Sequence, residues 1–91
     1  MTQLDALYSV HDIAIRCGVD VAFVDRLVEL GVISTHPGRE RRFACEVTLR
    51  VGKFVRLQRD LGVNNEGAAL IVELLDRIET LEHRLKHLQG R

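Results

Sequence analysis

Two histidines, His83 and His87, lie four residues apart near the C-terminus and are the first candidates for chemistry in this sequence. On a helix that spacing places both imidazoles on one face, where they could ligate a metal ion, and Glu79 could add a carboxylate. Both histidines fall off the apolar face of the helix predicted there, and no cysteine lies nearby as a further ligand. We therefore interpret them as solvated side chains and predict no metal site and no cofactor.

The two cysteines, Cys17 and Cys45, stand far apart and show no paired spacing. We interpret them as reduced, largely buried thiols of a cytosolic protein. His11 and His36 are isolated in the sequence, and no arrangement of serine, histidine and aspartate can be traced that would activate a nucleophile. The residues therefore predict a protein that is not an enzyme.

Charge is distributed unevenly along the 91 residues, although 13 basic and 13 acidic side chains cancel overall. Residues 36–59 contain seven arginines and lysines against two acids, whereas residues 1–35 and 60–91 each carry an excess of acids. A basic middle with acidic flanks indicates two surfaces of opposite sign. Composition, with 46% hydrophobic and 29% charged residues, is typical of a folded, helix-rich domain and not of a disordered chain.

Neither a membrane span nor a secretory signal is predicted. The sequence has no run of 18 apolar residues, and its first residues lack a basic region followed by an apolar stretch. We expect a cytoplasmic protein.

Local signals predict two short helices joined by a tight turn. Ser9 and Asp12 have the spacing of a capping pair, and the apolar periodicity after them predicts a helix to about residue 16. Gly18 can adopt the positive φ that ends a helix, and Asp20 can cap a second helix that stops at Gly31. Two helices connected in this way form a helix-turn-helix.

The next segment predicts a small β-hairpin and a third helix. Pro37-Gly38 is a strong turn signal, and it is flanked by Val32-Ile33 and Arg42-Phe43, which we expect to be the paired strands of a wing. A third helix is predicted from Glu46 to the Leu61-Gly62-Val63 stop.

The fourth helix, capped by Asn64 or Asn65, carries a heptad pattern. Six apolar residues with alternating spacings of three and four form its seam: Ile71, Leu74, Ile78, Leu81, Leu85 and Leu88. Leu70, Val72 and Leu75 broaden the apolar surface of the N-terminal half, which we therefore expect to pack on its own domain. The alternative is a helix that folds back within one chain, but the narrow C-terminal seam favours self-association.

The predicted order of elements, together with several short motifs, resembles the MerR superfamily over essentially the whole chain. The matching segments are Tyr8-Ser9-Val10, Leu30-Gly31-Val32-Ile33, Gly38-Arg39-Glu40-Arg41-Arg42-Phe43 and Leu57-Gln58-Arg59-Asp60-Leu61-Gly62. The fold class expected is all-α, a winged helix-turn-helix of four helices with a small β-hairpin wing. Residues 1–62 would form the winged domain, and residues 63–91 a coiled-coil helix that forms a homodimer.

Within that superfamily, the stretch from Asp60 to Ile71 followed by Leu74-Leu75-Asp76-Arg77-Ile78 is similar to the chaperone-modulator (CbpM-like) branch. The run Glu66-Gly67-Ala68-Ala69 is the most informative part, since helix packing by itself does not require that order. Members of the branch bind the J domain of DnaJ-like co-chaperones and hold it away from its Hsp70 partner. The resemblance therefore implies a non-enzymatic modulator with a J-domain partner.

DNA binding by a MerR-like transcription regulator is the alternative. The resemblance places Arg41 where MerR regulators use a wing arginine, and Arg39 and Arg42 could also lie along phosphates. Arg50, Lys53 and Arg56 would extend this patch if the third helix presents them outward. Against this reading, Asp25 and Arg26 stand where DNA-binding relatives carry an arginine and an aromatic residue, and a carboxylate repels phosphate.

A competitor for the basic helix of a J domain should offer carboxylates. We expect Glu66, Glu73 and Asp76, which lie off the heptad seam, to form such a surface on the outer side of the fourth helix. The rival acidic set is Asp20, Asp25 and Glu29, and either set could instead be an ordinary solvated face. A structural or adaptor subunit with some other protein partner is a third class of function.

The orientation of the coiled coil is open at this point. Isoleucines alternating with leucines along the seam suit a parallel pair, whereas the resemblance to MerR proteins implies an antiparallel one.

Overall fold

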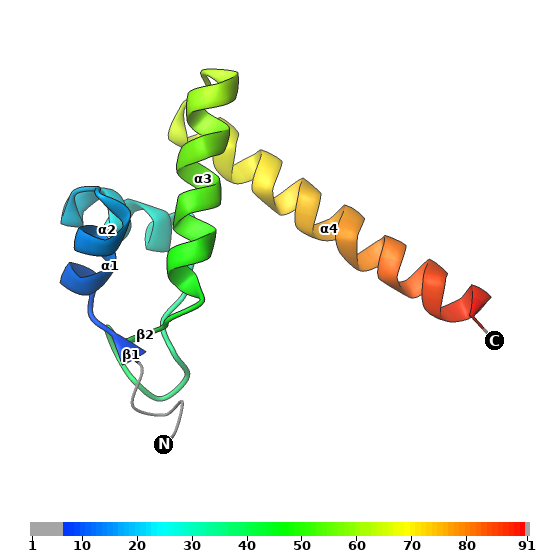
Figure 1. Ribbon diagram of the computed structural model, residues 1–91, viewed down its shortest axis with the longest axis horizontal. Helices are drawn as coiled ribbons and strands as arrows, with labels where there is room; N and C mark the ends of the chain where they lie inside the picture. The colour runs from blue at the N-terminus through cyan, green and yellow to red at the C-terminus, as the bar shows by residue number, and fades with distance from the viewer. Residues whose placement is uncertain (1–6, 91) are drawn as a thin grey trace.

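A computed structural model describes residues 7–90, which form four helices and a short antiparallel strand pair at the bottom of the view in Figure 1. The elements in chain order are β1 (Leu7–Tyr8), α1 (Val10–Cys17), α2 (Val21–Glu29), β2 (Phe43–Ala44), α3 (Val47–Leu61) and α4 (Asn65–Gln89). The predicted winged helix-turn-helix class is confirmed. Residues 1–6, on which the expectation of no secretory signal depends, and Arg91 lie outside the described residues.

The start and end of α1 follow the predicted capping signals. The Ser9 backbone N–H donates to the Asp12 carboxylate at 2.9 Å, and the Asp12 N–H donates to the Ser9 hydroxyl at 3.1 Å, a reciprocal capping box. Hydrogen bonding from the Ser9 backbone amide, and next from the Ser9 side chain, favours the ionised carboxylate and lowers the pKa of Asp12. Gly18 has φ of 69° and ends the helix in the left-handed conformation. Asp20 stands at the N-cap of α2, although its side chain makes no capping hydrogen bond.

The core lies where α1 and α2 pack on one side of α3 (Figure 1). Its largest fully buried side chains are Phe43, Phe54, Ile13, Leu27, Val24, Val51 and Val72. Phe23 of α2 meets Phe54 of α3 edge to face, with ring centroids 5.9 Å apart. The N-terminal half of α4 packs on its own domain as predicted, through Ala68 and Val72, and then the helix extends away from the other elements as a single rod (Figure 1).

The predicted pairing of the wing strands is wrong. Phe43 and Ala44 pair with Tyr8 and Leu7, and not with Val32 and Ile33. The reason is that the Val32 and Ile33 amides both donate to the Leu27 carbonyl and so close the end of α2, while their side chains are buried in the core. These amides are therefore unavailable to a strand partner.

The segment between the helix-turn-helix and β2 forms a closed loop. The Pro37-Gly38 turn is present, with Gly38 at φ of 77° and the Arg39 N–H donating to the His36 carbonyl at 3.0 Å. The His36 N–H donates to the Arg42 carbonyl at 2.6 Å, which closes the loop at its base. The wing is thus a loop held by turns beside the β1–β2 pair.

Among the described residues, no helix combines the length and apolar character needed to cross a membrane.

Candidate functional site

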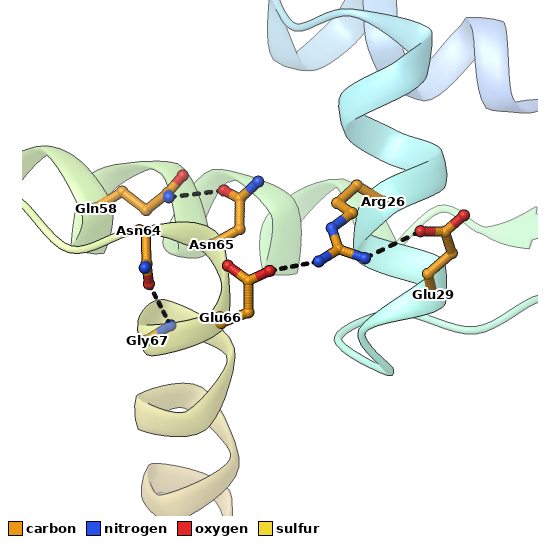
Figure 2. Close-up of polar contacts among 7 residues, drawn as sticks. All are labelled: Arg26, Glu29, Gln58, Asn64, Asn65, Glu66 and Gly67. Atoms are coloured by element: carbon orange, nitrogen blue, oxygen red, sulfur yellow. Dashed lines mark hydrogen bonds and ion pairs between the residues drawn. The ribbon is translucent and has the colours of Figure 1, made fainter.

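The junction between α3 and α4 fixes the direction in which α4 leaves the domain. Asn64 caps α4 by accepting from the Gly67 N–H at 2.7 Å, and the Gln58 side-chain amide of α3 donates to Asn65 Oδ1 at 2.8 Å (Figure 2). The same amide also donates to the Val63 carbonyl at 3.3 Å. These contacts hold both ends of the short connection, so the start of α4 is oriented by the end of α3.

A first ion pair ties α2 to α4. The Arg26 guanidinium bonds Glu66 of α4 with one amino group and Glu29 of its own helix, at 3.1 Å, with the other (Figure 2). The hydrogen bonds to Glu29 and Glu66 raise the pKa of Arg26. Hydrogen bonds from its own backbone amide and from Arg26 lower the pKa of Glu66. Arg26 is the only basic residue of α2, and two carboxylates neutralise it.

A second ion pair ties α3 to α4. Arg50 faces Asp76 with both amino groups, Nη2 at 2.5 Å from Oδ2 and Nη1 at 3.4 Å from Oδ1. Its Nε donates to the Val32 carbonyl in the segment after α2. The Arg50 contact holds the pKa of Asp76 below its usual range. Arg50 therefore connects three parts of the chain, and it does not extend the wing's basic patch as the sequence suggested.

These contacts border an open groove of about 380 Å³ between the end of α2 and the N-terminal half of α4. Its lining residues combine apolar side chains with carboxylates: Leu30, Gly31, Val32, Glu66, Ala69, Leu70, Glu73 and Asp76. The structure thus brings together all three acidic residues proposed from the sequence. Leu70 is 57% exposed there, and Glu73 makes only a surface contact with Arg77 at 3.3 Å.

The predicted position of this acidic set is wrong for Glu66 and Asp76. Both lie beside the rest of the domain and are engaged by arginines, and not on the outer side of α4. The reason is geometric. Successive helical residues are turned by about 100°, and the side of α4 away from the heptad seam is the side that packs on α3. Residues off the seam, such as Glu66 and Asp76, therefore lie beside the domain. Sequence reasoning also missed Arg50 as a connecting residue and Leu30 as part of the lining, since neither stands within a periodic pattern that indicates the groove.

The rival acidic set lies on and beside α2. Asp20 and Glu29 are exposed and Asp25 is half-buried. Since Arg26 is already paired, the described part of α2 has no free cation to approach a phosphate. Its electrostatic character is therefore opposite to that of a DNA-reading helix.

The wing carries the positive surface. Arg39, Arg41 and Arg42 are all exposed on the loop between α2 and β2. Arg41 has φ of 60°, an uncommon conformation for a residue with a side chain. Lys53 and Arg56 of α3 are also exposed.

The seam of α4 is open to solvent. Ile71 is half-buried, whereas Leu74, Ile78, Leu81, Leu85 and Leu88 are between 48% and 68% exposed. Every residue from Arg77 to Gly90 is exposed. Leu70 and Leu75, which we expected to help pack the N-terminal half, are exposed as well. A contiguous apolar stripe of this kind usually marks an interaction surface.

The candidates for metal or thiol chemistry do not assemble into a site. His83 and His87 are exposed, and within residues 7–90 no three side chains of the metal-ligating types cluster. Cys17 and Cys45 are free and half-buried. Cys17 donates to the Thr48 carbonyl at 3.6 Å, and burial raises the pKa of its thiol, which makes it a poor nucleophile.

Packing accounts for the Glu66-Gly67-Ala68-Ala69 run, contrary to the expectation from sequence. Glu66 pairs with Arg26, Ala68 is completely buried, and Ala69 packs against the core. A Cβ at Gly67 would lie 3.1 Å from the capping oxygen of Asn64, so glycine leaves room for the cap. The run is therefore informative about the α3–α4 junction and carries less information about a partner.

A family model described as MerR HTH family regulatory protein matches residues 8–90. The chain therefore belongs to the MerR HTH family of regulatory proteins. The match extends through α4 and supports the family assignment made from the motifs.

Proposed function

From this family membership we propose that the chain is a non-enzymatic regulator that works by binding a protein, the J domain of a DnaJ-like co-chaperone, in the cytoplasm. The groove between α2 and α4 would receive the basic helix of that partner. Binding there would keep the J domain from its Hsp70 partner.

The observation that carries the proposal is the combination of apolar and acidic side chains in one groove. Leu30 and Leu70 offer the apolar surface that an amphipathic helix needs, and Glu66, Glu73 and Asp76 line the same groove. All three carboxylates already bond arginines of the same chain. A carboxylate has about four lone-pair positions, so each can accept a further hydrogen bond from a partner's lysine or arginine. Glu73 has the weakest existing contact and is the freest of the three.

The electrostatics of α2 support a protein partner over DNA. Helices that read DNA approach a dense row of phosphates, and their own charge must be favourable. Here the only arginine of α2 is neutralised by Glu29 and Glu66, and Asp20 adds a further negative charge at the N-terminus.

We also propose that the protein is a homodimer through α4, with residues 1–62 as the winged domain and 63–91 as the dimerisation helix. Ile71, Leu74, Ile78, Leu81, Leu85 and Leu88 would form its interface. A single helix with an exposed leucine stripe is marginally stable in water, and pairing buries that stripe.

The second candidate is DNA binding through the wing. It is favoured by Arg39, Arg41 and Arg42, which are exposed on one loop. The wing arginines would bind DNA phosphates, and the affinity would therefore depend strongly on salt concentration.

Parallel titrations at physiological salt distinguish the two functions. One uses a purified J domain and the other a mixed-sequence DNA duplex of matched concentration. We expect saturable binding of the J domain and weak DNA binding that disappears as salt is raised. Tight, sequence-selective DNA binding without a J-domain signal would overturn the proposal in favour of the wing.

A further inference from the structure

We propose that Arg26 of α2 acts as a built-in competitor for the cationic partner of the groove, through its contact with Glu66. The proposal rests on the function proposed above and concerns how that same groove is regulated. The chain's own guanidinium occupies a carboxylate that a partner's lysine or arginine would use. It therefore limits how tightly that partner binds.

The contacts of Arg26 allow it to leave Glu66 without losing all of its partners. One amino group of the guanidinium bonds Glu66, and the other bonds Glu29 at 3.1 Å (Figure 2). Because different nitrogens make the two contacts, loss of the contact with Glu66 leaves the contact with Glu29 in place. Arg26 and Glu29 lie three residues apart on one helix, a spacing at which side chains meet without any help from α4.

The Arg26–Glu66 pair is open to solvent. The two side chains are 40% and 60% exposed, so a partner's side chain can reach the carboxylate. Exposed ion pairs of this kind are weak, because water screens the two charges and both long side chains lose freedom when they pair. An incoming cation can therefore take the place of the guanidinium.

The cluster of Arg26, Glu29 and Glu66 carries one net negative charge, since two carboxylates share one guanidinium. When a partner's cation binds Glu66 and Arg26 stays with Glu29, each of the four charges has an opposite partner. If Arg26 also stays on Glu66, two cations meet at one carboxylate and repel each other. In both cases Arg26 weakens the binding of the partner at Glu66, and the cluster still attracts a cation.

Arg50, which bonds the groove carboxylate of Asp76, is held differently. Two of its nitrogens face Asp76, and its Nε donates to the Val32 carbonyl. In the described part of the chain no second carboxylate lies within ion-pair distance of Arg50. Its release from Asp76 would leave the guanidinium without an acidic partner, so Arg50 holds the fold and Arg26 is the arginine that can exchange.

The orientation of α4 does not depend on Arg26 alone. Asn64 caps the helix, and Gln58 of α3 bonds Asn65 at 2.8 Å. Ala68, one turn into α4, is completely buried in the core. A substitution of Arg26 should therefore leave the groove in place, which circular dichroism and urea unfolding of the variant can verify.

Titration of the full chain with a purified J domain tests the competition. Arg26→Met keeps a long apolar stem and removes the charge. It should tighten J-domain binding about two- to fivefold, the range expected for one exposed ion pair. Arg26→Gln, which is polar and uncharged, should act in the same way. The matched control is Arg59→Met, because Arg59 is exposed on α3, pairs with its neighbour Asp60 and does not line the groove. Its affinity should equal that of the parent.

A double-mutant cycle with Glu66→Gln assigns the effect to the contact itself. In the Glu66→Gln background, Arg26→Met should no longer tighten binding, because no carboxylate at position 66 is released. A role for Arg26 in positioning α4 predicts the opposite sign, since Arg26→Met would then weaken binding.

Salt dependence is a second readout that a positioning role would not change. The parent exchanges one ion pair for another when a cation binds Glu66, whereas the Arg26→Met variant gains an ion pair that it did not have. The affinity of Arg26→Met for the J domain should therefore fall more steeply with salt concentration than that of the parent.

A second probe separates this inference from the identity of the partner. A synthetic amphipathic helix of leucine and lysine offers a cationic and apolar face without the J-domain fold. Tighter binding of this peptide by Arg26→Met, dependent on Glu66, would support the competition even if no J domain binds.

Three results would overturn the inference: no tightening by Arg26→Met with either probe, an equal gain in the Glu66→Gln background, or an equal gain from Arg59→Met. Saturable J-domain binding by the parent chain would still support the proposed function in each of these cases.

Discussion

Arg26 of α2 and Glu66 of α4 form an ion pair between residues that lie 40 positions apart in the sequence. The contact has two consequences. It orients the groove-lining start of α4 against α2, and it removes the only cation of α2 from any role in phosphate binding. A helix that occupies the DNA-reading position of the fold is thereby left without a free positive charge.

The salt dependence of residual DNA binding should therefore reside in the wing. Each phosphate contact contributes about 0.9 to the slope of log affinity against log salt concentration. Arg41→Gln should reduce that slope by about 1, whereas Arg26→Gln should leave it unchanged. The measurement is a fluorescence titration of a labelled duplex at several salt concentrations. An equal reduction of the salt slope in the Arg41→Gln and Arg26→Gln variants would mean that α2 also contacts DNA.

The Arg50–Asp76 pair should make stability depend on pH in the acid range. The pKa of Asp76 is lowered in the folded chain, so its ionised form stabilises the fold above the unfolded value of about 3.9. That contribution is lost as pH falls through the lowered folded pKa. The Asp76→Asn substitution should lower the free energy of unfolding at pH 7 by about 1 kcal/mol or less, since the side chains of Arg50 and Asp76 are both partly exposed.

The difference in free energy of unfolding between the Asp76→Asn variant and the parent chain should shrink as the pH falls toward 3. Urea unfolding at one fixed protein concentration measures it, because dimerisation makes stability depend on concentration. Glu79→Gln is the matched control, as an exposed carboxylate with no ion pair among residues 7–90. If the free energy of unfolding of Asp76→Asn differs from that of the parent chain by the same amount at every pH, the stabilising ion pair between Arg50 and Asp76 would be contradicted.

Two glycine substitutions should differ although both sites are helical. Gly52→Ala should stabilise the chain by about 0.5–1 kcal/mol, because alanine favours helix and the nearest atom to the new Cβ is the flexible end of Arg56 at 3.4 Å. Gly67→Ala should give no such gain, because its Cβ crowds the Asn64 cap at 3.1 Å. Thermal unfolding of the two variants compares them. An equal gain at both sites would show that the Asn64 cap does not constrain residue 67.

Local signals in the sequence predicted the fold well. The Ser9–Asp12 capping box, the Gly18 and Gly62 helix ends and the Asn64 cap are all present as expected, because each depends on contacts within a few residues. The partner of Phe43–Ala44 was mispredicted. Val32 and Ile33 have the apolar character of a strand, and only the tertiary structure shows that their amides are already used by Leu27.

The candidate site was predictable in composition but not in geometry. Glu66, Glu73 and Asp76 were identified from charge and from their place off the seam. Their side chains turned out to line one groove because Arg26 and Arg50, distant in sequence, bond two of them. Long-range ion pairs of this kind leave no periodic trace in a single sequence, so neither the groove nor the arginines' role could be read from it.

The most direct test of the account is a J-domain titration of three forms of the full chain: the parent, Glu73→Lys and Glu79→Lys. Glu73 lines the groove and makes only an exposed contact with Arg77, so its reversal should leave the fold intact, as circular dichroism can verify. We predict that Glu73→Lys weakens J-domain binding at least tenfold, while Glu79→Lys binds like the parent. Parent-like affinity for Glu73→Lys, or no saturable binding of the J domain by the parent chain, would contradict the proposed groove.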